Sequence, residues 1–139
     1  MGSIGGVYLF RIPEGEEFIS YVTKFLEKED IKAGVVKAVG TLRNPKIGYF
    51  LEKEKRYKIN ELEGTYEIAS LMGNISIKDG KPFLHVHVVL GDEEGVAYGG
   101  HLIEGEVFVA EVFVMEIVGV ELERKMRENG LALWDEMRL

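Results

Sequence analysis

The sequence predicts an α+β domain in which one main helix packs on a strongly curved, largely antiparallel mixed sheet. Most of the 139 residues fall into runs with the alternating or continuously apolar pattern of strands. A single stretch near the N-terminus has apolar residues at helical spacing, and short turn sequences join most of the runs. The length suits one domain, which we place at residues 1–139, with about seven strands.

The first elements should be a strand and the main helix. The strand is expected at Gly6–Ile12, ending before Pro13. The helix is expected from about Glu14 to Asp30, because glutamates fill its first turn and lysines lie toward its end, the charge order that the helix dipole favours. The apolar side chains that should pack on the sheet are Phe18, Val22, Phe25 and Leu26.

The central part of the chain predicts more strands. Two of them are expected on either side of an Asn44-Pro45 turn, and a third follows after a charged segment. The three strands are Ala33–Thr41, Ile47–Leu51 and Thr65–Ile77. The charged segment, Glu52–Lys58, alternates in sign, which is typical of a solvated loop or an edge strand.

The C-terminal part predicts a central strand and a short helix. After a turn at Glu104–Gly105, the segment Val107–Val118 is almost entirely apolar on both faces and should be covered on both sides. Leu122–Asn129 is expected to form a short C-terminal helix capped by Gly130. One main helix cannot cover this much apolar sheet, so strand surface must close on itself or pack against another subunit.

The composition excludes several classes of protein. Because there is no cysteine, disulfides and thiolate metal sites are excluded. No apolar run is long enough for a transmembrane helix, and no signal peptide is apparent, so we expect a cytoplasmic protein that does not contact membranes. The net charge of −7 disfavours DNA as a partner. Abundant Glu and Lys without Gln or Cys is typical of a thermophile.

All three histidines fall within seventeen residues, and two of them share one predicted strand. This strand, Phe83–Leu90, follows a hairpin turn at Asp79–Gly80. Strand side chains alternate between faces, so His85 and His87 should point the same way, about 7 Å apart. The residues between and beside them form a second face that is wholly apolar and predicts burial.

The position of His101 depends on the hairpin that follows. Gly91–Gly95 suits a five-residue hairpin loop, which would place Leu90 opposite Val96. Counting outward from that pair puts His101 directly across from His85, on the same face. A slip of one residue would send it to the opposite face.

Three imidazoles that converge on one patch are the ligand set of an open zinc site. The alternative is that these are hydrogen-bonded core histidines without a metal. Since imidazoles must be neutral to bind, metal affinity should fall below about pH 6. Four further residues are expected to line the site, the last two as candidate acid–base groups or, alternatively, as structural glutamates: Gly99, Gly100, Glu67 and Glu111.

Four segments, taken together in the order in which they occur along the chain, resemble the plant and prokaryote conserved (PPC) domain. They are Glu67–Ile75, Leu84–Val88, Tyr98–Leu102 and the Gly105-x-Val that follows. The resemblance implies an α+β domain that assembles as a homotrimer. It also implies metal binding by His85, His87 and His101, because prokaryotic members with these motifs resemble metal-binding proteins.

In plants the PPC domain follows AT-hook motifs in nuclear proteins that bind AT-rich DNA and regulate transcription. This chain contains no Arg-Gly-Arg-Pro hook, the element that enters the minor groove. Three functions therefore remain open. The first is a homotrimeric zinc-binding module of uncharacterised, regulatory role, and the second is a DNA-associated regulator. The third is a zinc-dependent hydrolase, in which the metal would lower the pKa of water toward ~7. The sequence identifies no substrate.

Overall fold

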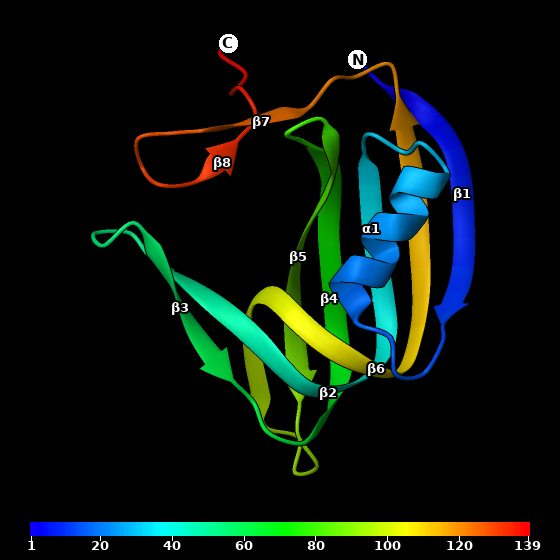
Figure 1. Cartoon of the computed structure of the whole chain (residues 1–139), viewed down its shortest axis with the longest axis vertical. Coiled ribbons are helices and arrows are strands. Elements are labelled where there is room, and N and C mark those ends of the chain that lie inside the picture. Colours follow the sequence, from blue (N-terminus) through cyan, green and yellow to red (C-terminus); the bar gives the residue numbers. More distant parts are fainter.

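Eight strands and one helix make up the structure of residues 1–139, a computed structural model (Figure 1). The single helix is α1 (Phe18–Lys28), which follows the first strand. The strands are β1 (Ser3–Ile12), β2 (Gly34–Leu51), β3 (Arg56–Glu61), β4 (Thr65–Lys78), β5 (Lys81–Gly91), β6 (Ala97–Val118), β7 (Glu123–Met126) and β8 (Ala132–Leu133).

The pairing of the four longest strands closes on itself. Strand β2 pairs with both β6 and β4, and each of these pairs with β5. Strand β1 pairs with β6 outside this ring, β3 extends the sheet from β2, and the β4–β7 pairing is parallel while the other pairings are antiparallel. The predicted curved, largely antiparallel mixed sheet is confirmed. Closure also buries part of the apolar strand surface that one helix cannot cover.

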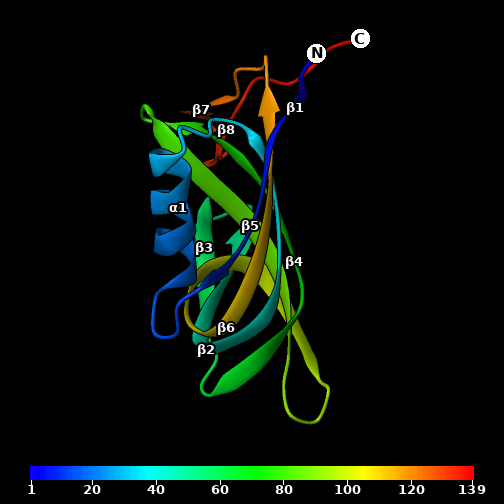
Figure 2. The same ribbon diagram turned by 90° about the vertical axis from the view of Figure 1, so that its right-hand side faces the viewer.

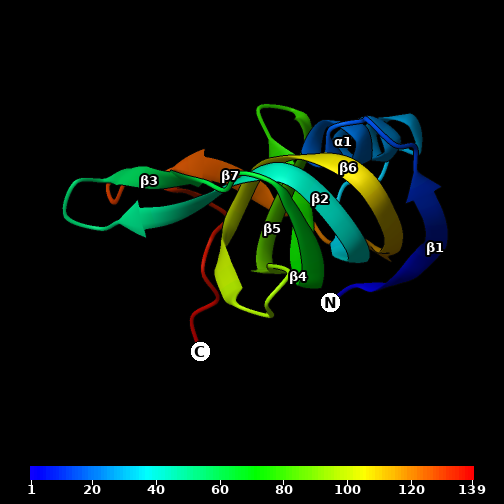
Figure 3. The same ribbon diagram turned by 90° about the horizontal axis from the view of Figure 1, so that it is seen from below.

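Helix α1 covers one side of the curved sheet (Figures 2 and 3). It begins at Phe18 and not at the predicted Glu14, because Glu17 is the N-cap residue. The carboxylate of Glu17 accepts the main-chain N–H groups of Ile19 and Ser20, both at 2.9 Å. These bonds satisfy two donors that the first helical turn leaves without intrahelical partners. The helix is neither long nor apolar enough to cross a membrane.

The core lies between α1 and the side of the sheet that faces it. The helix contributes Phe18, Val22 and Leu26, all fully buried, while Phe25 is half-buried against the ring of Phe10. Strand β5 contributes every second residue, and these four are buried: Leu84, Val86, Val88 and Leu90. The predicted alternation of β5 between an apolar and a histidine-bearing face is therefore present.

Two predicted turns are bends within long strands. Strand β2 continues through Asn44–Pro45, where Asn44 has a φ of 47° and forms two hydrogen bonds with Gly64, of 2.7 and 2.8 Å. Strand β6 continues through Glu104–Gly105, where the N–H of Gly105 donates to the N-cap carboxylate of α1 at 3.1 Å. Partners distant in sequence satisfy these polar groups, so strand pairing resumes beyond each bend.

The predicted C-terminal helix at Leu122–Asn129 is wrong, because this segment forms strand β7 and the start of the turn that leads to β8. Strand β7 pairs with the end of β4, with Glu123 opposite Ile77. Arg124 on this strand is only 7% exposed. Gly130 has a φ of +88° and reverses the chain between the two strands. Tertiary partners thus outweigh the local helical pattern.

The side of the sheet opposite α1 carries exposed apolar residues. Leu9 on β1 is 74% exposed, Val39 on β2 is 56% exposed and Met72 on β4 is 53% exposed. The strand register aligns one row across this surface: Leu9, Phe113, Lys37, Met72 and His87. We call the surface formed by this row and Val39 the outer face.

The buried face of β5 and the exposed loop that follows it should respond differently to truncation. Leu90→Ala should lower the free energy of unfolding by about 2–5 kcal/mol, because Leu90 is fully buried and the change leaves a cavity. The control is Val96→Ala in the next loop, where Val96 is 48% exposed and little change is expected. Chemical denaturation of both variants measures the difference, and equal losses of stability would contradict the described core.

Candidate metal centre

Three histidines converge where β5 pairs with β6. His85 and His87 lie two residues apart on β5 and share one face, and His101 lies on β6. One ring nitrogen from each lies within 4.8 Å of those of the other two. The ring centroids are 5.2–5.7 Å apart. Imidazoles at these separations can coordinate one metal ion with modest side-chain adjustment.

The hairpin register differs from the predicted one, although the shared face is as predicted. His101 lies opposite His87 and not opposite His85. The loop spans residues 92–96 instead of Gly91–Gly95, and the carboxylate of its first residue accepts two main-chain N–H groups of the loop at 2.9 Å. This loop shifts the pairing by two residues. Because strand side chains repeat every two residues, the shift keeps His101 on the histidine face.

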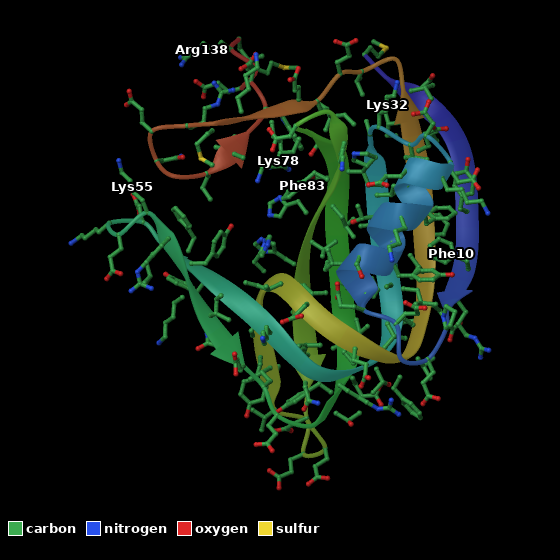
Figure 4. All side chains as sticks on the ribbon, in the orientation of Figure 1. Phe10, Lys32, Lys55, Lys78, Phe83 and Arg138 are labelled. Atoms are coloured by element: carbon green, nitrogen blue, oxygen red, sulfur yellow. The ribbon has the colours of Figure 1, made fainter.

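The histidines line a cavity of about 520 Å³. The cavity also includes residues of β2, β3, β5 and the β7–β8 hairpin, and Figure 4 shows Phe83 below that hairpin. Its apolar and aromatic lining includes Tyr49, Phe50, Tyr57, Phe83, Leu131 and Leu133. Arg124 is the one side chain with a permanent charge among the lining residues, which include no aspartate or glutamate. The cavity therefore presents nitrogen groups within a largely apolar wall.

The surroundings keep two of the histidines uncharged at neutral pH. Burial lowers the pKa of His85 to about 4, and the positive charge of Arg124 adds to the effect, followed by His101 and His87. Burial also lowers the pKa of His101, with further contributions from His87 and Arg124. A neutral imidazole keeps a lone pair for a metal ion, so these lowered pKa values favour metal binding at pH 7.

The Nδ1 atom of His101 is buried and has no hydrogen-bond partner in the protein. The ring lies 5.0 Å from that of Tyr57, measured between centroids, which offers an aromatic neighbour and no polar one to this nitrogen. A buried nitrogen without a partner is costly, at about 1–3 kcal/mol. A metal ion bound to the three imidazoles would either take this lone pair or fix the tautomer of the ring. The residues present therefore fit a metal ion.

Arg124 is a site residue that the sequence did not reveal. Its Nε donates to the Ser76 hydroxyl at 2.6 Å, one terminal nitrogen donates to the Ala132 carbonyl at 2.9 Å, and the other donates to the Asn74 side-chain oxygen at 2.9 Å. That second nitrogen also lies 3.3 Å from Nδ1 of His85. Its guanidinium group is thus fixed beside the histidines.

No local pattern could have placed Arg124 in the site. It is separated by 39–50 residues from His85, Ser76 and Asn74, and its own segment was predicted to be a helix. The ring centroids of Phe83 and Trp134 lie 5.2 and 4.7 Å from its guanidinium carbon. These rings add cation–π contacts to the hydrogen bonds that hold the guanidinium.

The four further residues expected at the site are distributed differently. Gly100 lines the cavity, where a Cβ atom would lie 2.8 Å from the carbonyl oxygen of Gly48. Gly99 borders a separate shallow hollow that also includes His87. Glu67 lies near the start of β4, where it accepts a hydrogen bond from a threonine, and Glu111 lies opposite an arginine of β1. Neither glutamate lines the cavity.

Solved structures include several with the same fold. A plant- and prokaryote-conserved (PPC) protein from Pyrococcus horikoshii is 57% identical with a TM-score of 0.98, and the match covers 100% of this chain and 97% of that one. A metal-containing protein from Archaeoglobus fulgidus is 42% identical with a TM-score of 0.93, covering 98% and 97%. A Bacteroides thetaiotaomicron protein provisionally described as DNA-binding is 26% identical with a TM-score of 0.86, covering 97% of each chain.

The family itself is shown by the sequence. A search among curated proteins gave no match. Residues 1–118, which include every strand of the closed ring and all three histidines, match the model of one family. The chain therefore belongs to the Plants and Prokaryotes Conserved (PCC) domain family, which its histidine-containing segments were found to resemble.

Proposed function

We propose that this protein is a metal-binding module in which His85, His87 and His101 hold one divalent ion, zinc. The observation that carries the proposal is the convergence of three ring nitrogens within 4.8 Å on the wall of a cavity. The lowered pKa values of His85 and His101 provide further support. So does the buried Nδ1 of His101, which has no hydrogen-bond partner. A metal ion would satisfy each of these features.

The donor set supports zinc as the metal. Three imidazole nitrogens without thiolates suit zinc, nickel or copper, and zinc is favoured by its availability and by the open three-histidine pattern. The relative from Archaeoglobus fulgidus, which is metal-containing, has the same fold and 42% identity with this chain. A zinc ion held in this way would leave one coordination position toward the cavity.

A binding role is better supported than hydrolysis. A zinc hydrolase needs a general acid or base beside the metal. The two glutamates considered for that role, Glu67 and Glu111, do not line the cavity. The cavity wall combines aromatic and aliphatic side chains with Arg124 and the histidines, a composition that suits a bound small molecule.

We also propose that the outer face binds other copies of this chain in a cyclic homotrimer. Exposed Leu9, Val39 and Met72 lie on neighbouring parts of one sheet surface, and burying them would be favourable. Charges of both signs lie on or beside this face: Lys37 belongs to it, and Glu111 is paired with Val39, so two copies can be complementary. The family resemblance supplies the number three.

DNA binding is the second candidate function, and the relative from Bacteroides thetaiotaomicron favours it. The basic residues in the charged segment lie on the β2–β3 hairpin, and Figure 4 shows Lys55 at its tip. Arg56 in this hairpin is paired with Glu54 at 2.5 Å. The net charge of −7 and the alternating signs give little surplus positive charge to neutralise phosphates. Metal binding is therefore the function that we propose first.

The metal proposal predicts stoichiometric zinc uptake that depends on the three histidines. Replacing any one histidine by alanine should weaken zinc binding by more than about 100-fold. Losing a residue that only hydrogen-bonds to a ligand weakens metal binding by up to about 100-fold, and losing a ligand itself should cost more. The variant lacking all three should bind none, while circular dichroism shows the native fold. Elemental analysis and competition with a chelator measure these effects. Stoichiometric zinc in the triple variant, or none in the native protein at pH 7, would refute the site.

The lowered pKa values predict the titration of the metal-free protein. His85 should stay neutral until the pH falls to about 4, compared with an ordinary value of 6.5. Between these values the unfolded chain binds more protons than the folded one, so the stability of the metal-free protein should decrease as pH falls from 6.5 toward 4. Imidazole NMR signals, assigned by single His→Ala variants, give each midpoint. A midpoint near 6.5 for His85 would show that its ring is solvated.

The trimer proposal predicts an assembly that depends on the outer face. Light scattering should give three times the 15.7 kDa chain mass at micromolar concentration. Val39→Glu should produce monomers, because it would bury a carboxylate in an apolar contact. Met137→Glu is the control, since Met137 is 87% exposed and lies on none of the strands that form the outer face. A native monomer would rule the assembly out.

A further inference from the structure

We propose that the metal centre also binds a small carboxylate with an apolar body, held between the metal position and Arg124. This inference rests on the proposed metal binding and names the ligand that the same cavity would take. Three features of the cavity carry it. They are its charge, the competition for one lone pair of His85, and the hydrogen-bonding groups that Arg124 has left to offer.

The charge of the loaded cavity requires an anion. A divalent ion contributes two positive charges and Arg124 contributes a third, whereas three neutral imidazoles contribute none. The lining residues include no aspartate or glutamate to balance this charge. Arg124 is only 7% exposed, so water screens its charge poorly. Uncompensated charges in such a place are costly, and an anion from solution would provide the compensation.

Arg124 and a metal ion compete for the same histidine. A guanidinium group can only donate hydrogen bonds, so Nδ1 of His85 accepts from Arg124 at 3.3 Å and the ring proton resides on Nε2. A metal ion at Nδ1 would displace Arg124. A metal ion at Nε2 would move the proton to Nδ1, which could then no longer accept. In both cases metal binding breaks the contact between Arg124 and His85.

The broken contact leaves Arg124 with two N–H groups to satisfy. A guanidinium has five N–H groups, and three of them are used by Ser76, Ala132 and Asn74. The fourth is the group released from His85, and the fifth has no partner among the protein hydrogen bonds. These two belong to the two terminal nitrogens. A carboxylate accepts such a pair of N–H groups in a fork-like arrangement.

The wall of the cavity determines which anion is favoured. Phe50, Tyr57, Leu131 and Leu133 provide apolar and aromatic surface beside the charged end. The volume of about 520 Å³ lies within the usual range for small-molecule sites. A phosphate group carries more charge and needs more donors than the two that Arg124 has left. A small monocarboxylate with an apolar body meets both requirements, and benzoate is a suitable probe.

The inference can be tested with cobalt(II), whose visible absorption changes when its ligands change. The protein is loaded with cobalt, its metal content is measured, and benzoate is added in a chloride-free buffer. We expect a saturable spectral change with benzoate, none with the neutral analogue benzamide, and a weaker response to inorganic phosphate. By thermodynamic linkage, benzoate should raise the affinity for cobalt by the same factor as cobalt raises the affinity for benzoate.

Variants of Arg124 distinguish its role from general electrostatics. Arg124→Gln should weaken benzoate binding at least tenfold, while cobalt binding without benzoate is retained or strengthened because the competition for His85 is removed. Lys78→Gln is the matched control, since Lys78 is another cation near the Phe83 ring but does not line the cavity. It should leave benzoate binding unchanged. If Arg124→Gln does not fold, Arg124→Lys should still weaken benzoate binding several-fold, because lysine lacks the paired donors.

The possible failures are distinguishable. No cobalt uptake would refute the proposed metal site itself. Stoichiometric cobalt without a response to benzoate would refute the carboxylate inference and leave the metal site standing. Equal responses to benzoate and benzamide, tighter binding of phosphate than of benzoate, or unchanged benzoate binding in the folded Arg124 variant would each overturn the inference as well.

Discussion

The two-residue alternation of β5 is the constraint on which the candidate site depends. Leu84, Val86, Val88 and Leu90 are buried on the side of the sheet that faces α1. Because successive side chains of a strand point to opposite faces, burial of these four residues directs His85 and His87 to the other face. The two histidines could change face only if the core residues became exposed. Pairing with β6 then brings His101 to the same patch. The hydrophobic core thus positions the polar site without contributing a ligand to it.

The site also depends on parts of the chain that lie far apart in sequence. The β2–β3 hairpin brings Tyr57 to the ring of His101, and the β7–β8 hairpin brings Arg124 to His85. These two hairpins project to the same side of the molecule in Figure 1 and contribute to the cavity walls. The ring of strand pairings supplies the floor of the cavity, and the hairpins supply the walls. Ligand preference should therefore reside in the hairpins, and metal binding in the floor.

The sequence predicted what short-range periodicity determines and missed what distant partners determine. The α+β class, the faces of β5 and the grouping of three histidines follow from alternation, which is a local property. The pairing of His101 with His87 was missed because it depends on the conformation of residues 92–96. The C-terminal helix was wrong because the buried contacts of Arg124 form with residues 39–50 positions away. Arg124 could not be assigned to the site for the same reason.

The central claim is that three imidazoles from two paired strands hold one metal ion. X-ray absorption spectroscopy at the zinc edge of the loaded native protein tests it most directly, because the method identifies the atoms around the metal. The account predicts three imidazole groups with Zn–N distances of about 2.0–2.1 Å, one or more further light-atom ligands, and no sulfur. A coordination shell with fewer than three imidazoles, or one made of oxygen ligands alone, would contradict it.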